Sequence, residues 1–84
     1  MERILKAIEE KRNAGYGNNQ LEVVCGCPNS LDVDEDGYAK EGYFIAKLNS
    51  WGSTPITDVL VPEGEIKDSK LIEELDKLEI AYCL

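Results

Sequence analysis

Turn-forming residues divide this chain into segments that are too short for any long helix or strand. Groups of Gly, Asn and Pro that interrupt regular structure occur at residues 15–19, 26–30, 49–55 and 62–64. The whole chain has 84 residues, so it has room for one modest hydrophobic core. We therefore expect a single domain, residues 1–84.

Two segments have the periodicity of amphipathic helices. The first covers residues 2–13, and the second is predicted to begin at Asp68 or Ser69, either of which can cap it, and to end at Leu78. The apolar stripes consist of Ile4, Leu5, Ala7 and Ile8 in the first helix, and of Leu71, Ile72, Leu75 and Leu78 in the second.

Four other segments have the composition or the alternation of β-strands. They are residues 21–25, 42–48, 56–61 and 79–84. The Asp36-Gly37 pair predicts a hairpin turn that joins residues 31–33 to the strand at 42–48, and residues 49–55 are predicted to form a loop. We expect the last strand to lie in the sheet, because its backbone groups need hydrogen-bond partners.

The order of the elements is helix, strand, β-hairpin, strand, helix, strand. This order predicts an α+β fold: a small two-layer sandwich in which both helices pack on one face of a mostly antiparallel sheet.

Acidic residues dominate the charge of the chain. Seventeen acidic residues against nine basic ones give a net charge of −8. This charge disfavours direct binding to nucleic acid or to an anionic membrane, and it favours a basic protein partner. The chain has no histidine, which is the commonest general base and the commonest metal ligand, so we do not expect an enzyme.

The three cysteines are Cys25, Cys27 and Cys83. No apolar run is long enough for a membrane helix and no secretory leader opens the chain, so we expect a cytoplasmic protein with reduced thiols. A structural zinc site needs four Cys or His ligands, and the chain offers three. No cofactor is therefore expected.

Residues 32–37, Asp-Val-Asp-Glu-Asp-Gly, resemble the opening of an EF-hand calcium loop. The resemblance stops there, since the twelfth position holds Tyr43 instead of a bidentate Glu, and Glu41 comes two residues too early. A solvated acidic turn is the favoured interpretation. Weak calcium binding by Asp32, Asp34 and Asp36 is an alternative, and contact with a partner is another.

Trp51, the single tryptophan, lies among Gly, Ser, Thr and Pro residues. A lid that folds back over the core is the favoured interpretation. The alternative is an exposed anchor for a partner, a setting in which Trp is enriched.

The leading hypothesis is a small acidic binding protein, not an enzyme, that docks on a basic surface of a protein partner. Its sharpest version is an inhibitor or nucleic-acid mimic of the kind that mobile elements use against nucleic-acid-handling enzymes. One alternative is the calcium module; another is a structural or oligomerising subunit that pairs through Ile80, Tyr82 and Leu84 of the C-terminal strand. The residues assigned to partner binding are Asp32, Asp34, Glu35, Asp36, Glu41 and Trp51.

Overall fold

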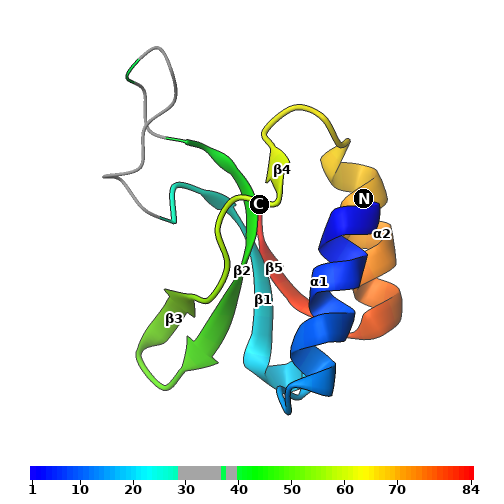
Figure 1. The fold of residues 1–84 in the computed structure, drawn as a ribbon. Helices are drawn as coiled ribbons and strands as arrows, with labels where there is room; N and C mark the ends of the chain where they lie inside the picture. Colours follow the sequence, from blue (N-terminus) through cyan, green and yellow to red (C-terminus); the bar gives the residue numbers. More distant parts are fainter. Residues whose placement is uncertain (29–36, 38–39) are drawn as a thin grey trace.

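Two helices lie side by side on one face of a five-stranded sheet (Figure 1). The computed structural model describes residues 1–28, 37 and 40–84. The helices are α1 (Glu2–Asn13) and α2 (Asp68–Leu78), and a short 3-10 helix, η1 (Asn18–Gln20), precedes the sheet. The strands are β1 (Leu21–Gly26), β2 (Gly42–Asn49), β3 (Gly52–Pro55), β4 (Val61–Pro62) and β5 (Ala81–Cys83). The predicted α+β class is confirmed.

The sheet is mixed but mostly antiparallel, as predicted. Its strand order is β3-β2-β1-β5, and β4 pairs with β2 along the same edge as β3. β2 is antiparallel to β1, β3 and β4, whereas β5 runs parallel to β1. The C-terminal strand therefore lies in the sheet, at the edge opposite β3.

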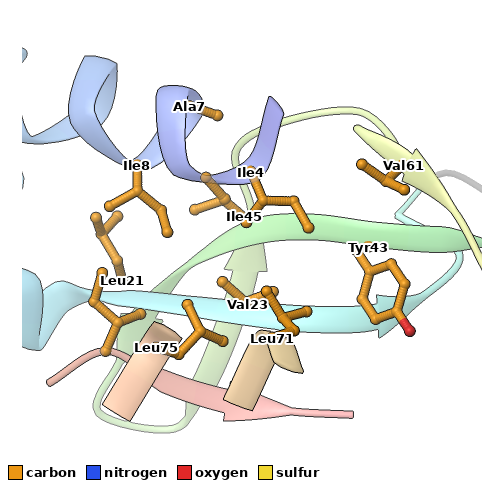
Figure 2. Close-up of a cluster of buried hydrophobic side chains, with 11 residues drawn as sticks. Ile4, Ala7, Ile8, Leu21, Val23, Tyr43, Ile45, Val61, Leu71 and Leu75 are labelled. Carbon is orange, nitrogen blue, oxygen red and sulfur yellow. The ribbon is translucent and has the colours of Figure 1, made fainter. Parts of the chain in front are cut away.

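One face of the sheet and the inner faces of both helices form the hydrophobic core. Ile4 and Ile8 of α1 reach toward Ile45 of β2, and Leu71 and Leu75 of α2 lie over Val23 of β1 (Figure 2). Burying a side chain of this size contributes about 1.5–3 kcal/mol, so these contacts hold the two layers together. The prediction that both helices share one face is confirmed. The buried core consists of Ile4, Ala7, Ile8, Leu21, Val23, Tyr43, Ile45, Val61, Leu71, Leu75 and Ile80.

The start of α2 differs from the predicted one, and its end is held by a contact that the sequence did not reveal. The predicted cap at Asp68 or Ser69 is wrong: Lys67 is the N-cap, and Asp68 is the first helical residue. At the other end Glu79 adopts the left-handed conformation with φ +57°, and the Asn18 side-chain amide donates to the Leu78 carbonyl at 2.8 Å.

Within the described residues, neither helix has the length and apolar character needed to cross a bilayer.

The loop predicted at residues 49–55 and the strand predicted at residues 56–61 both differ from the structure. Residues 49–55 are not a loop, because Ser50 and Trp51 form a two-residue turn that leads directly into β3. The strand predicted at residues 56–61 is wrong for most of its length, because residues 56–60 form no strand and regular pairing begins at Val61, in β4. The predicted hairpin arm at residues 31–33 lies outside the described residues.

Thr57 explains the interruption between β3 and β4. Its side-chain oxygen accepts a hydrogen bond from the Ile45 N–H at 3.0 Å, where a regular ladder would use a backbone carbonyl. The chain then bulges outward and returns where the Leu60 N–H donates to the Tyr43 carbonyl at 2.8 Å. The edge strand along β2 is thus split into β3 and β4.

Gly42 allows the returning chain to approach β2 closely. A Cβ atom on Gly42 would lie 2.3 Å from the Val61 carbonyl oxygen and 2.7 Å from Cγ1 of Val59. The first of these atoms belongs to the backbone of the paired strand and cannot rotate away. Only glycine fits here without movement of β4.

We predict that Gly42→Ala lowers the free energy of unfolding by about 1–3 kcal/mol, as expected for overpacking, and that urea denaturation measures the loss. Gly26→Ala is the matched control, because Gly26 pairs directly with Gly42 and its added Cβ would meet nothing closer than the Phe44 ring at 3.9 Å. Equal losses in the two variants would contradict the assignment of the close approach to Gly42.

Candidate functional site

Three carboxylates from separate parts of the chain gather where β1 ends and β2 begins. Glu41 directly precedes β2, Glu63 directly follows β4, and Asp68 is the first residue of α2. All three act on the Cys25 thiol of β1: partial burial, followed by the negative charges of Glu63, Asp68 and Glu41, raises its pKa. We call Glu41, Glu63 and Asp68 the acidic end.

The sequence predicted one of these three residues. Glu41 was assigned to partner binding, whereas Glu63 looked like part of a turn and Asp68 like a helix cap. The pairing of β4 with the start of β2 brings them together, and the Glu63 N–H donates to the Glu41 carbonyl at 3.4 Å. No local pattern signals this contact, because it joins residues far apart in the chain.

The other predicted acidic residues, Asp32, Asp34, Glu35 and Asp36, lie outside the described residues, and so does the alternative calcium site. The segment that carries them joins Gly26 to Gly42, which are paired at the acidic end. Within residues 1–28, 37 and 40–84, no group of three Cys, Asp or Glu side chains is arranged to hold a metal ion.

Tyr43 connects the acidic end to the core. Its ring is buried, with 2% of its surface exposed, and its hydroxyl donates a hydrogen bond to the Asp68 carboxylate. This hydrogen bond, together with burial and the nearby negative charges, raises the pKa of Tyr43 to about 12. The contact ties the first residue of α2 to the second residue of β2.

The surroundings of the acidic end favour the protonated form of its two thiols. Cys25 is half-buried and Cys27 is exposed. Partial desolvation and a hydrogen bond to the Glu41 carboxylate raise the pKa of the Cys27 thiol. Because the thiolate is the nucleophile, this environment lowers thiol reactivity. All three cysteines of the chain, including Cys83, are free of disulfide bonds.

Trp51 is fully presented to solvent at the tip of the β2–β3 hairpin, which projects away from both helices (Figure 1). Its residue surface is 88% exposed, so the interpretation as a core lid is wrong. The hairpin is held by Gly52, which adopts φ +150°, and by a 2.8 Å hydrogen bond from the Asn49 amide to the Thr54 hydroxyl. The turn places the indole in water, on a regular two-stranded support.

The structure does not bring Trp51 and Glu41 together. They flank opposite ends of β2, whose eight residues span roughly 25 Å. The predicted site therefore separates into two regions, the acidic end and the Trp51 hairpin.

A groove of about 860 Å³ lies between α1 and α2. Its lining carries balanced charge, with Glu9 and Arg12 on α1 and Glu74 and Lys77 on α2, and the last two form an ion pair at 3.5 Å. The groove therefore has no preference for a ligand of either sign. Its other lining residues are Leu5, Ile8, Asn13, Tyr16, Gly17, Asn18 and Leu78.

Comparison of the chain with protein-family models, with curated proteins and with solved structures found no match. The charge, exposure and geometry of its own residues are therefore the basis on which a function can be inferred.

We predict that Tyr43→Phe lowers the free energy of unfolding by about 1–3 kcal/mol at neutral pH, as expected for losing a partly buried hydrogen bond to a charged group. The pKa of Tyr43 rises from 10.0 in the unfolded chain to about 12 in the folded protein. The stabilisation is therefore complete below pH 10 and is lost as the pH rises to 12. Urea denaturation of the unaltered protein and of Tyr43→Phe between pH 10 and pH 12 should show that the difference between their free energies of unfolding becomes smaller as the pH rises. Tyr82→Phe, at an exposed tyrosine, is the control, and a difference that stays constant to pH 12 would contradict the role of Asp68.

We also predict that Glu41→Gln accelerates alkylation of Cys27 at pH 8. Removing the carboxylate removes the hydrogen bond and the negative charge that raise the thiol pKa, so more thiolate is present. Iodoacetamide kinetics in a Cys25→Ser/Cys83→Ser background isolate this thiol. Glu10→Gln, which makes the same charge change on the outer surface of α1, should leave the rate unchanged. If Glu41→Gln and Glu10→Gln change the alkylation rate of Cys27 equally, the net charge of the protein sets the reactivity of this thiol, and the contact with Glu41 does not.

Proposed function

We propose that this chain is a non-enzymatic binding protein that docks on a basic surface of a protein partner. The observation that carries the proposal is the acidic end, where Glu41, Glu63 and Asp68 converge on the end of β1. The segment that contains Asp32, Asp34, Glu35 and Asp36 begins and ends beside them. Glu41, which was assigned from the sequence, thus lies at the same end of the sheet as Glu63 and Asp68, which the fold adds.

The physical basis is the negative charge that these three carboxylates place at one end of the sheet. Glu41, Glu63 and Asp68 are exposed and unlike charges can reach them. A partner that brings Lys or Arg side chains is attracted to this charge, and because the attraction acts before contact, it raises the association rate. The same chemistry supports the version in which the protein is a nucleic-acid mimic and inhibitor: carboxylates on a rigid support can occupy a basic channel that otherwise holds phosphates.

Trp51 supplies a second, apolar contact in this proposal. A tryptophan that is 88% exposed gains hydrophobic stabilisation when a partner covers it. The roughly 25 Å between Trp51 and Glu41 fits within an interface of standard size, which buries about 800 Å² on each partner. One partner can therefore reach both regions.

The test is capture of the partner from the native host, identification by mass spectrometry, and association kinetics with the purified partner. We predict that Glu41→Gln/Glu63→Gln slows association several-fold at about 10 mM salt and has a smaller effect at about 150 mM, where screening is stronger. Trp51→Ala should instead raise the dissociation rate with little salt dependence, because it removes a desolvated anchor.

Glu10→Gln/Asp76→Asn is the matched control. It removes the same two charges from exposed positions near the C-terminal ends of α1 and α2, away from the acidic end. Its association rate should stay close to that of the unaltered protein. The acidic end is not the docking surface if both double variants slow association equally. The same conclusion follows if both associate as fast as the unaltered protein.

A further inference from the structure

The two edges of the sheet differ in their capacity to accept another strand. The Ile56 N–H donates to the Ile45 carbonyl and the Leu60 N–H to the Tyr43 carbonyl, so odd-numbered residues of β2 direct their backbone groups toward β3 and β4. In β3 the outward backbone positions are therefore Ser53 and Pro55, and Pro55 has no N–H. With this proline and the interruption after β3, that edge is closed to strand addition.

In the part of the chain that the structure describes, no strand pairs with the outer edge of β5. Because even-numbered residues of β2 face β1, Val23 directs its backbone groups away from β2 and toward β5. Val23 lies opposite Tyr82 in the parallel pairing, so Ala81 and Cys83 bond back to β1. The N–H and carbonyl of Tyr82 point away from the sheet, and the alternation gives the N–H of Leu84 the same direction. These groups are a template for a further strand.

The side chains along this edge are exposed and apolar. Tyr82 is 38% exposed and Leu84 is 39% exposed, and they share the face of the strand on which Ile80 enters the core. Ala81 and Cys83 occupy the other face and are also exposed. Residues 79–84 contain neither the proline nor the lysine that natural proteins place on unpaired edges.

The charged side chains of the two strands at this edge are negative. In β1 and residues 79–84 the charged side chains are Glu22 and Glu79. Glu22 lies opposite Ala81, whose small side chain leaves open the space between Glu22 and the edge. A strand added beside β5 would lie roughly 10 Å from β1, within the combined reach of a Glu and a Lys side chain across Ala81.

We propose that β5 binds an extended segment of the basic partner as an additional strand, in which basic residues alternate with apolar ones. The apolar side chains lie beside Tyr82 and Leu84, and the basic ones lie beside Ala81 and approach Glu22. This inference deepens the proposed function and rests on it, since the partner is the same basic protein. A second copy of the chain is disfavoured as occupant, because it would bring a charge of −8 against −8.

The probe is an end-blocked heptapeptide of alternating lysine and valine, titrated into the isotope-labelled protein. In the unaltered protein, we predict that the peptide changes the chemical shifts of Tyr82 and Leu84 and slows the hydrogen exchange of their backbone amides. Tyr82→Pro should bind the peptide at least about tenfold more weakly than Tyr82→Ala, because both lose the ring but only the proline loses the outward N–H. The β1–β5 bonds do not use that N–H, so the proline is compatible with the fold. A peptide with glutamate in place of lysine should not bind.

The remaining outcomes separate this inference from the proposed function. If Glu41→Gln/Glu63→Gln abolishes binding while Tyr82→Pro and Tyr82→Ala bind equally, the peptide docks at the acidic end; the inference about β5 is then overturned and the proposed function is supported. A concentration-dependent dimer that Tyr82→Pro dissociates would identify a second copy as the occupant and overturn the inference. Absence of shifts at Tyr82 and Leu84 also overturns it, while partner capture tests the proposed function independently.

Discussion

β2 is the strand on which the rest of the structure depends. It pairs with β1 on one side and with β3 and β4 on the other, so both of its edges are hydrogen-bonded. Residues from Gly42 to Ala46 are all buried, on both faces of the sheet. Its helix-facing residues Tyr43 and Ile45 meet side chains of both helices in the core. A central strand of this kind fixes the positions of all its neighbours at once, and the other strands of the sheet are shorter.

The candidate site is a consequence of how β2 begins. Gly42 has no side chain, which lets β4 return against the strand and carry Glu63 beside Glu41. One residue later, the Tyr43 hydroxyl holds Asp68 and with it the start of α2. Two adjacent residues of β2 thus bring carboxylates from three parts of the chain to one end of the sheet. The core contacts behind Tyr43 are apolar and do not depend on this charge.

The helices and the core stripes could be predicted because their signals are local: Leu71 and Leu75 recur at helical spacing, and burial follows from that spacing. The split edge could not be predicted, because a threonine that replaces a backbone acceptor looks like any other threonine in a strand. Glu63 and Asp68 were missed for a related reason, since their proximity to Glu41 depends on strand pairing between distant segments. Whether Trp51 covers the core or is exposed was left open, because its surrounding residues suit a loop and a hairpin tip equally well. Only the pairing of Asn49 with Gly52 decides between the two.

The position of Trp51 also determines what the protein's intrinsic fluorescence reports. The chain has a single tryptophan, and this residue is already 88% exposed in the folded state. Its indole stays in water whether the core is intact or lost, so its emission carries little information about unfolding, and circular dichroism is the appropriate probe of stability. A blue shift of that emission would instead register another molecule covering the tip of the hairpin. The native chain therefore carries its own optical label for contact at that tip.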